Sequence, residues 1–131
     1  MKPGSVTDLK AMLVGMDPKL SERAWAFHTL VDDTFIPDTA FAIIREEEGV
    51  TCILPATAAA TGAVQFARIT LQVHSDLEGV GLTAAVSNAL AHKGIACNVV
   101  AAAHHDYLFV PWDQRERALK QLEKLSLDAR R

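Results

Sequence analysis

The segment from Ser75 to Gly81 has the residue types that could bind an anion. It contains glycines at positions 79 and 81, and a predicted helix over residues 82–93 follows it. A helix start presents unpartnered backbone N–H groups and a positive dipole end, and glycine lets a ligand approach the backbone closely. A carboxylate could therefore bind without a basic side chain, at the N–H groups of Gly79, Val80, Gly81 and Leu82. The alternative is that both glycines only permit a tight turn between a strand and a helix.

Three further polar residues are candidates for binding the rest of a ligand. Asp106 precedes a predicted apolar strand, and its carboxylate could bind an ammonium group or could cap its own turn. Glu78 offers the same chemistry from the loop, with a solvated loop acid as the alternative. Asn98 lies within an apolar strand, where its amide could bind a ligand or the neighbouring backbone.

Metal binding and nucleophilic catalysis find little support in the sequence. His74, His104 and His105 are candidate ligands, but adjacent histidines on an extended chain point to opposite faces. The sequence has no His-x-x-x-His or Cys-x-x-Cys pair. Cys97 with His92 or His104 could be a nucleophile and its base, but it lies in an apolar strand, where buried cysteine is common. We therefore expect no catalytic residue, no metal and no cofactor.

Composition narrows the class of protein further. The chain has 131 residues, of which 50% are hydrophobic and 22% charged, so we expect a folded chain with a substantial core. Its formal net charge of −3 argues against nucleic-acid binding, which needs a concentrated basic surface. No run approaches the roughly 20 apolar residues of a membrane span, and residues 1–5 lead into no apolar signal core. With only two cysteines, Cys52 and Cys97, we expect a cytoplasmic protein.

The second half of the sequence must position these candidate residues. Alternation and helical periodicity predict strand 65–74, helix 82–93, strand 95–101, strand 107–110 and helix 113–127. This β–α–β–β–α order is most of the split β-α-β motif of ferredoxin-like folds. The positions that we expect to be buried are Leu71, Val73, Val86, Leu90, Val99, Leu108, Leu119 and Leu122.

The first half predicts a less regular version of the same plan. We expect a helix over 5–13 capped by Ser5, a strand over 24–31, a hairpin of strands 40–45 and 50–54, and a short helix within 55–62. The fold class is therefore α+β, with two small modules over residues 1–64 and 65–131. Because a module of this size is marginal by itself, we expect the two to share a continuous core.

Three segments carry a resemblance to a known family. The runs over residues 68–86, 94–101 and 105–111 resemble ACT domains, in the small bacterial proteins with two tandem ACT-like modules. The modules also resemble the regulatory part of aspartokinases and the CASTOR amino-acid sensors. Residues 65–126 resemble the family strongly, and residues 1–64 resemble a degenerate first module.

The resemblance implies a ferredoxin-like βαββαβ plan and small effectors, usually amino acids, bound at module interfaces. Two departures stand out: no strand follows helix 113–127, and the first module begins with a helix. A strand exchanged between modules, as in the aspartokinase type, would account for both departures.

These observations together predict a regulatory protein without catalytic activity that binds a small molecule, most simply an α-amino acid. The alternative is a protein-interaction module with no soluble ligand. We expect a homodimer with no nucleic-acid or membrane partner. We also expect the end of strand 65–74 and the start of strand 107–110 to meet only across a module or subunit interface.

Overall fold

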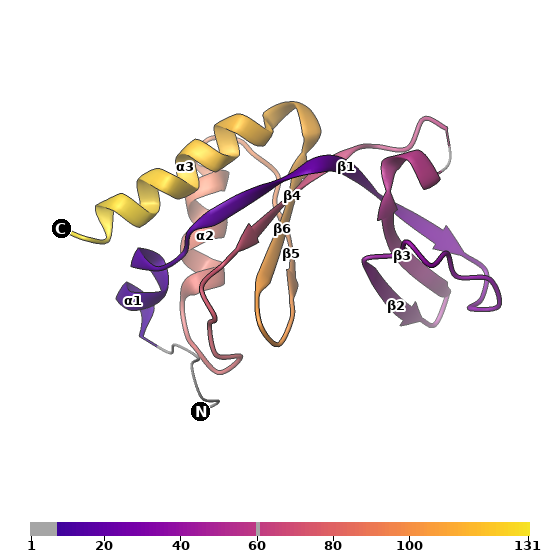
Figure 1. Ribbon diagram of the computed structural model, residues 1–131, viewed down its shortest axis with the longest axis horizontal. Coiled ribbons are helices and arrows are strands. Elements are labelled where there is room, and N and C mark those ends of the chain that lie inside the picture. Colours follow the sequence, from indigo (N-terminus) through magenta and orange to yellow (C-terminus); the bar gives the residue numbers. More distant parts are fainter. Residues whose placement is uncertain (1–7, 60) are drawn as a thin grey trace. The chain divides into compact units, whose positions relative to one another are not determined.

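A computed structural model describes residues 8–59 and 61–131 and divides the chain into two compact units (Figure 1). The first unit combines the chain up to Ser21 with Ala67–Arg131, and the second unit is Glu22–Phe66. The family modules predicted at 1–64 and 65–131 divide the sequence differently, because the first unit takes in the start of the chain.

The first unit has the ferredoxin-like plan. Its strands follow the order β1–β4–β6–β5 in the sheet. The elements are α1 (Leu9–Val14), the start of β1 (Pro18–Leu30), β4 (Phe66–Leu71), α2 (Leu82–Ala91), β5 (Asn98–Ala101), β6 (Asp106–Pro111), the 3-10 turn η2 (Trp112–Gln114) and α3 (Arg115–Asp128). From β4 onward this is β–α–β–β–α, as predicted.

The strand missing after α3 is supplied by the start of β1. The Gln72 amide donates to the Met16 carbonyl at 2.8 Å, and the Arg68 amide donates to Ser21 Oγ at 3.3 Å. Because the residue numbers run in opposite directions along these contacts, the two segments are antiparallel. β1 therefore completes the βαββαβ plan of the first unit and also contributes its later residues to the second unit.

Helix α1 begins later than predicted. Asp8 caps it, with its Oδ2 accepting from the Ala11 amide at 2.9 Å, and Gly15 ends it. The predicted cap Ser5 lies outside the described residues. Asp17 then turns the chain at φ 43°, and Gln72 Nε2 donates to both its carbonyl and its carboxylate at 3.0 Å. This turn lets β1 begin at Pro18 rather than at residue 24.

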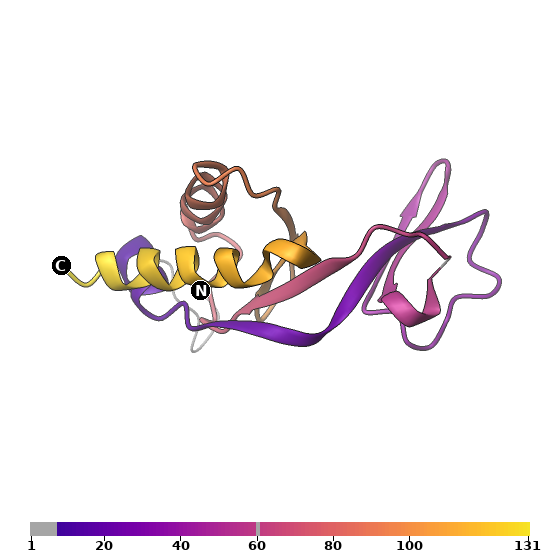
Figure 2. The ribbon, with the colours of Figure 1, turned by 90° about the horizontal axis from the view of Figure 1, so that it is seen from above.

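One core holds the first unit together. Alternate residues of β4 face it, together with one face each of α1, α2 and α3, and α2 and α3 lie beside each other (Figures 1 and 2). Six of the eight predicted core residues are buried, whereas Val99 and Leu119 are half-buried. Helix α3 instead buries Ala118, Leu122 and Ser126. This spacing of four residues places Leu119 beside the buried face rather than in it.

The second unit is a small antiparallel sheet in the order β2–β3–β1. Its elements are β2 (Ala42–Glu46), β3 (Gly49–Pro55), the 3-10 turn η1 (Ala56–Ala58) and the later part of β1. The predicted helix within 55–62 is reduced to η1. Val50, Cys52 and Leu54 form the core of the second unit. Trp25 packs edge-on against Phe41, with 5.7 Å between the ring centroids.

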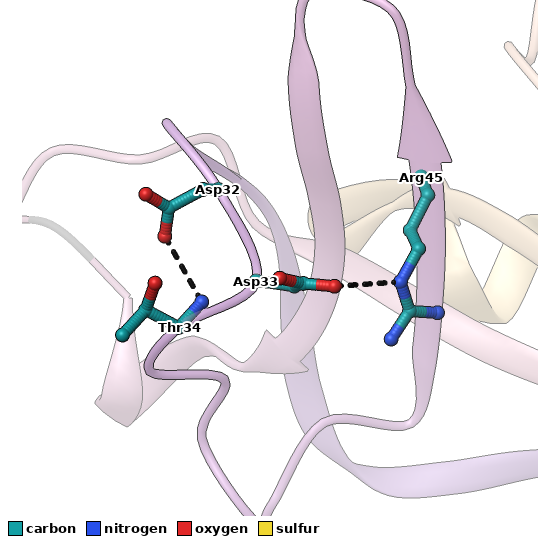
Figure 3. Close-up of polar contacts among 4 residues, drawn as sticks. All are labelled: Asp32, Asp33, Thr34 and Arg45. Carbon is teal, nitrogen blue, oxygen red and sulfur yellow. Dashed lines mark hydrogen bonds and ion pairs between the residues drawn. The ribbon is translucent and has the colours of Figure 1, made fainter.

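Charged residues of the second unit make exposed contacts. Arg45 Nε donates to Asp33 at 3.0 Å, and the Thr34 amide donates to Asp32 at 2.9 Å (Figure 3). Because both side chains of the Arg45–Asp33 pair are more than half exposed, the pair contributes little stability. These residues order a loop and form no enclosed site.

Candidate ligand-binding site

A pocket of about 160 Å³ lies in the first unit, where the loop after β4 meets the start of α2 and the start of β6. Its polar lining is Ser75, Asp76, Thr83 and Asp106. Its remaining lining is Met12, Leu77, Gly79, Gly81, Leu82 and Ala101. Four predicted site residues therefore lie together: Gly79, Gly81, Leu82 and Asp106.

Asp106 is the charged residue that faces the loop. Ser75 Oγ donates to Asp106 Oδ2 at 3.2 Å, and Ala101 pairs with Asp106 between β5 and β6. Burial raises the pKa of the Asp106 carboxyl, against opposing effects of the Ser75 hydrogen bond and of nearby His105. Our expectation that this strand start meets the loop only across an interface is wrong. The two meet within one unit because β4 and β6 are neighbours in the sheet.

The loop is shaped by its own hydrogen bonds. Asp76 Oδ1 accepts from the Glu78 amide at 2.8 Å, and the Asp76 carbonyl accepts from the Gly79 amide at 2.9 Å. The predicted ligand residues Glu78 and Val80 lie on this loop but are exposed and do not line the pocket. The Gly79 amide is already used by the turn, whereas the first N–H groups of α2 have no acceptor within the helix.

Both loop glycines have structural reasons to be glycine. Gly81 has φ +104°, and a Cβ on it would lie 3.1 Å from Leu9 Cδ2. A Cβ on Gly79 would lie 3.0 Å from the Asp76 carbonyl and 3.2 Å from Met12 Sδ. As the N-cap of α2, Gly81 provides no side-chain hydrogen bond to the first turn. The glycines thus serve the turn and also leave the helix start uncapped by a side chain.

Asn98 lies away from the pocket. It is exposed and pairs with Phe109, whereas the pocket lies at the Ala101–Asp106 end of the same hairpin. The structure therefore does not bring its amide to the other candidate residues.

The histidines beside the pocket pack against one another. The rings of His74 and His104 have centroids 5.3 Å apart, and those of His104 and His105 are 6.5 Å apart. Within residues 8–59 and 61–131, no group of three or more His, Cys, Asp or Glu side chains is arranged to hold a metal ion. Burial raises the pKa of the Cys97 thiol to about 11, so this side chain is a neutral thiol and a poor nucleophile at physiological pH.

Sequence reasoning missed several lining residues. Ser75 and Asp76 directly follow the predicted strand 65–74, and Thr83 lies in the first turn of the predicted helix 82–93. These positions beside the predicted helix start could have identified them as lining residues. Met12 carries no such signal, because no local pattern indicates that it packs on a loop more than 60 residues further along the chain.

Family models for ACT domains match the sequence over residues 4–70 and over residues 65–124. The chain belongs to the ACT-domain family. The two matches place two ACT modules in tandem, in a family of regulatory domains that respond to small molecules. No curated protein matches the chain.

Solved structures with the same fold include a chain from Vibrio cholerae that matches over most of its length. Protein VC0802 from Vibrio cholerae, of unknown function and named as a possible transport protein, shares 36% identity at a TM-score of 0.73. That match covers 86% of this chain and 92% of VC0802.

Two aspartokinase structures share the fold at low sequence identity. The regulatory subunit of aspartate kinase from Thermus flavus is 11% identical at a TM-score of 0.57, over 82% of this chain and 95% of that one. A structure of aspartokinase alpha and beta subunits has the same TM-score of 0.57 and coverage, at 13% identity.

Among the described residues, no helix is long and apolar enough to cross a membrane.

Proposed function

We propose that this ACT-domain protein is a regulatory protein without catalytic activity that binds a free α-amino acid in the pocket beside Asp106. The observation that carries the proposal is the composition of this pocket. The lining of this single pocket brings together a half-buried carboxylate, the start of α2 and apolar side chains. An α-amino acid is a zwitterion on a short apolar body, and it needs these three features within a few ångströms.

Asp106 is the proposed partner of the ligand ammonium group. The carboxylate has one hydrogen bond from Ser75, which fixes its orientation and leaves acceptor capacity for the ligand. Burial penalises its charge, so an ammonium ligand would relieve an existing desolvation penalty. A charge-assisted hydrogen bond of this kind is about twice as strong as a neutral one.

The start of α2 is the proposed partner of the ligand carboxylate. Leu82 and Thr83 line the pocket and belong to the first turn, where N–H groups have no acceptor within the helix. The helix is ten residues long, so its positive end favours an anion. The lining contains no Lys, Arg or His, so these N–H groups and the Thr83 hydroxyl are the available anion partners in the pocket.

The size of the pocket fits a small metabolite. Pockets for drug-sized ligands have volumes of roughly 300–1,000 Å³, whereas this one has about 160 Å³. A free amino acid is a ligand of the appropriate scale, and a nucleotide or a peptide is not.

The second candidate function is an interaction module with no soluble ligand. Exposed apolar residues favour it: Leu77 is 63% exposed and Val80 is 80% exposed on the loop beside the pocket. In that case the loop would contact a partner protein, and the glycines would serve only the turn.

A thermal-shift screen of the twenty amino acids separates the two functions. A ligand at 100 times its dissociation constant adds about 2.7 kcal/mol to the apparent stability, a shift of several degrees for a chain of this size. We expect at least one amino acid to produce this shift in the native chain and not in Asp106→Asn. The matched control is Asp38→Asn, since Asp38 is exposed and lies in the second unit. No shift with any amino acid at millimolar concentration would favour the interaction module.

A further inference from the structure

Helix α1 lies outside the βαββαβ plan, yet it forms part of the pocket. It precedes β1 in the chain and packs against the loop that leads into α2 (Figure 1). Leu9 and Met12 lie three residues apart on one helix face. Leu9 packs close to Gly81, and Met12 packs close to Gly79. The loop therefore lies directly against α1, and the absence of Cβ atoms at both glycines makes this approach possible.

Met12 reaches the pocket itself. It is 1% exposed and lines the pocket beside Leu77, Leu82 and Ala101. Methionine is unbranched and polarizable, so it forms an adaptable apolar wall. Two of the polar lining residues already use part of their hydrogen-bonding capacity within the protein. Ser75 donates to Asp106, and Asp76 accepts from the Glu78 amide. A ligand side chain in this pocket would therefore meet the apolar side chains of Met12, Leu77 and Leu82 beside these polar groups.

The charges of the lining limit which side chains fit. Both ionisable residues in the lining, Asp76 and Asp106, are acidic. A ligand with an acidic side chain would bring like charges together, and the small pocket volume disfavours an aromatic ring. An aliphatic side chain would bury apolar surface against Met12 without either penalty.

We propose that Met12 on α1 is a specificity-determining residue of this site and that it selects α-amino acids with aliphatic side chains. This inference rests on the proposed function, because it assigns the side-chain preference of the same pocket. It also gives α1 a role beyond packing, as the apolar wall that closes the pocket.

Calorimetric titration of the full chain with glycine, valine, leucine, phenylalanine, aspartate and lysine tests the inference. We expect valine or leucine to bind at least about tenfold more tightly than glycine, since each methylene in an apolar pocket changes affinity by roughly 10–200-fold. We expect aspartate to bind weakest. Equal affinities for glycine and the aliphatic ligands, or a preference for aspartate or lysine, would overturn the inference.

Variants of the apolar wall show whether Met12 sets the preference. Met12→Ala should raise the affinity for phenylalanine relative to valine by about tenfold, because it removes the wall. Since Met12 is buried and the variant can fail to fold, Met12→Leu and Leu77→Ser give independent readouts. Leu77→Ser should reduce the valine-to-glycine ratio several-fold, whereas Val80→Ser on the same loop should not, because Val80 does not line the pocket.

The outcomes distinguish this inference from the proposed function. If no amino acid binds the native chain, the proposed function fails, and this inference fails with it. If amino acids bind and depend on Asp106, but the side-chain preference is unchanged in Met12→Ala and Met12→Leu, the inference alone is wrong, whatever the effect of Leu77→Ser.

Discussion

Asp106 is the residue on which the electrostatics of the pocket depend. Burial raises its pKa, so the folded chain holds this proton to a higher pH than the unfolded chain does. The stability that the neutral carboxyl contributes is fully present below the unfolded pKa and is lost as pH rises through the folded pKa. The ionised form that a ligand ammonium requires is thus the form that the free pocket disfavours.

Ligand affinity should therefore depend on pH. We expect binding to weaken as pH falls from neutral toward 3.8, the ordinary aspartate value, because the raised pKa of Asp106 lies above it. Bound ammonium stabilises the carboxylate, so binding should release protons in this range. Calorimetry in two buffers of different ionisation enthalpy measures the release. Proton release that persists in Asp106→Asn would show that another group titrates.

Gly81 has a backbone conformation that other residues adopt with strain. Gly81→Ala should destabilise the first unit by about 1–3 kcal/mol, because its φ of +104° disfavours a Cβ and Leu9 lies 3.1 Å from where that atom would be. Denaturant unfolding measures the change. Gly94→Ala is the control for strain without a contact, since Gly94 has φ +69° and nothing within 4 Å of its Cβ position. Equal losses in both variants would mean that the Leu9 contact contributes nothing.

Glycine at position 79 constrains how the site can be tested. A bulky side chain there would push against the Asp76 carbonyl and Met12 as well as the pocket. Gly79→Val would therefore disturb the loop and α1 together, and a loss of binding in it would not identify the ligand site. Asp106→Asn and Leu77→Ser change single side chains that line the pocket and are the sharper variants.

Among the elements, α2 shows how well local pattern predicts structure. Leu82, Val86 and Leu90 follow the helical period and all three are buried, which confirms the prediction for Val86 and Leu90. Helix α3 shows the limit of the same reasoning. Its leucines predict a seam through Leu119, but small Ala118 and Ser126 are buried instead, and Ser126 Oγ donates to the Val14 carbonyl at 3.2 Å. Helical pattern identifies an apolar face, whereas the contact with α1 accounts for the small residue at position 126.

The core face of α2 provides a stability test at this scale. Leu90→Ala should lower the free energy of unfolding by about 2–5 kcal/mol, since Leu90 is fully buried and its removal leaves a cavity. Denaturant unfolding followed by circular dichroism is the measurement, with Leu127→Ala as the exposed control on α3. A loss under about 0.5 kcal/mol would contradict the packing of α2 described above.

For the whole molecule, the sequence predicts the order of elements better than their partners. The β–α–β–β–α order from residue 65 and the ferredoxin-like class were both predictable from periodicity and turns. Which strand completes the sheet was not, because the second unit lies between the start of β1 and the main part of β4 along the chain. The mostly polar residues 19–23 also show no alternation that marks them as a strand. Met12 was not predicted in the pocket for a similar reason, because it contacts a loop that is distant along the chain.

The strand order also bears on assembly. β2 and β5 stand at the ends of the order, and β2 exposes Ile43 at 41% and Ile44 at 45%. Exposed apolar edge strands tend to pair with another chain. We therefore expect a homodimer at tens of micromolar, and Ile44→Lys should weaken it. Analytical ultracentrifugation that finds only a 14.2 kDa species would contradict this expectation.

The proposed function depends most directly on the contact between a ligand ammonium group and Asp106. The decisive measurement is a calorimetric titration of the native chain and of Asp106→Asn with valine or leucine at neutral pH. We predict that the native chain binds, and that Asp106→Asn binds about 1.5–3 kcal/mol more weakly while unfolding at an unchanged or higher denaturant concentration. Binding of equal affinity in both chains would contradict the proposed site, and no binding to the native chain would contradict the proposed function.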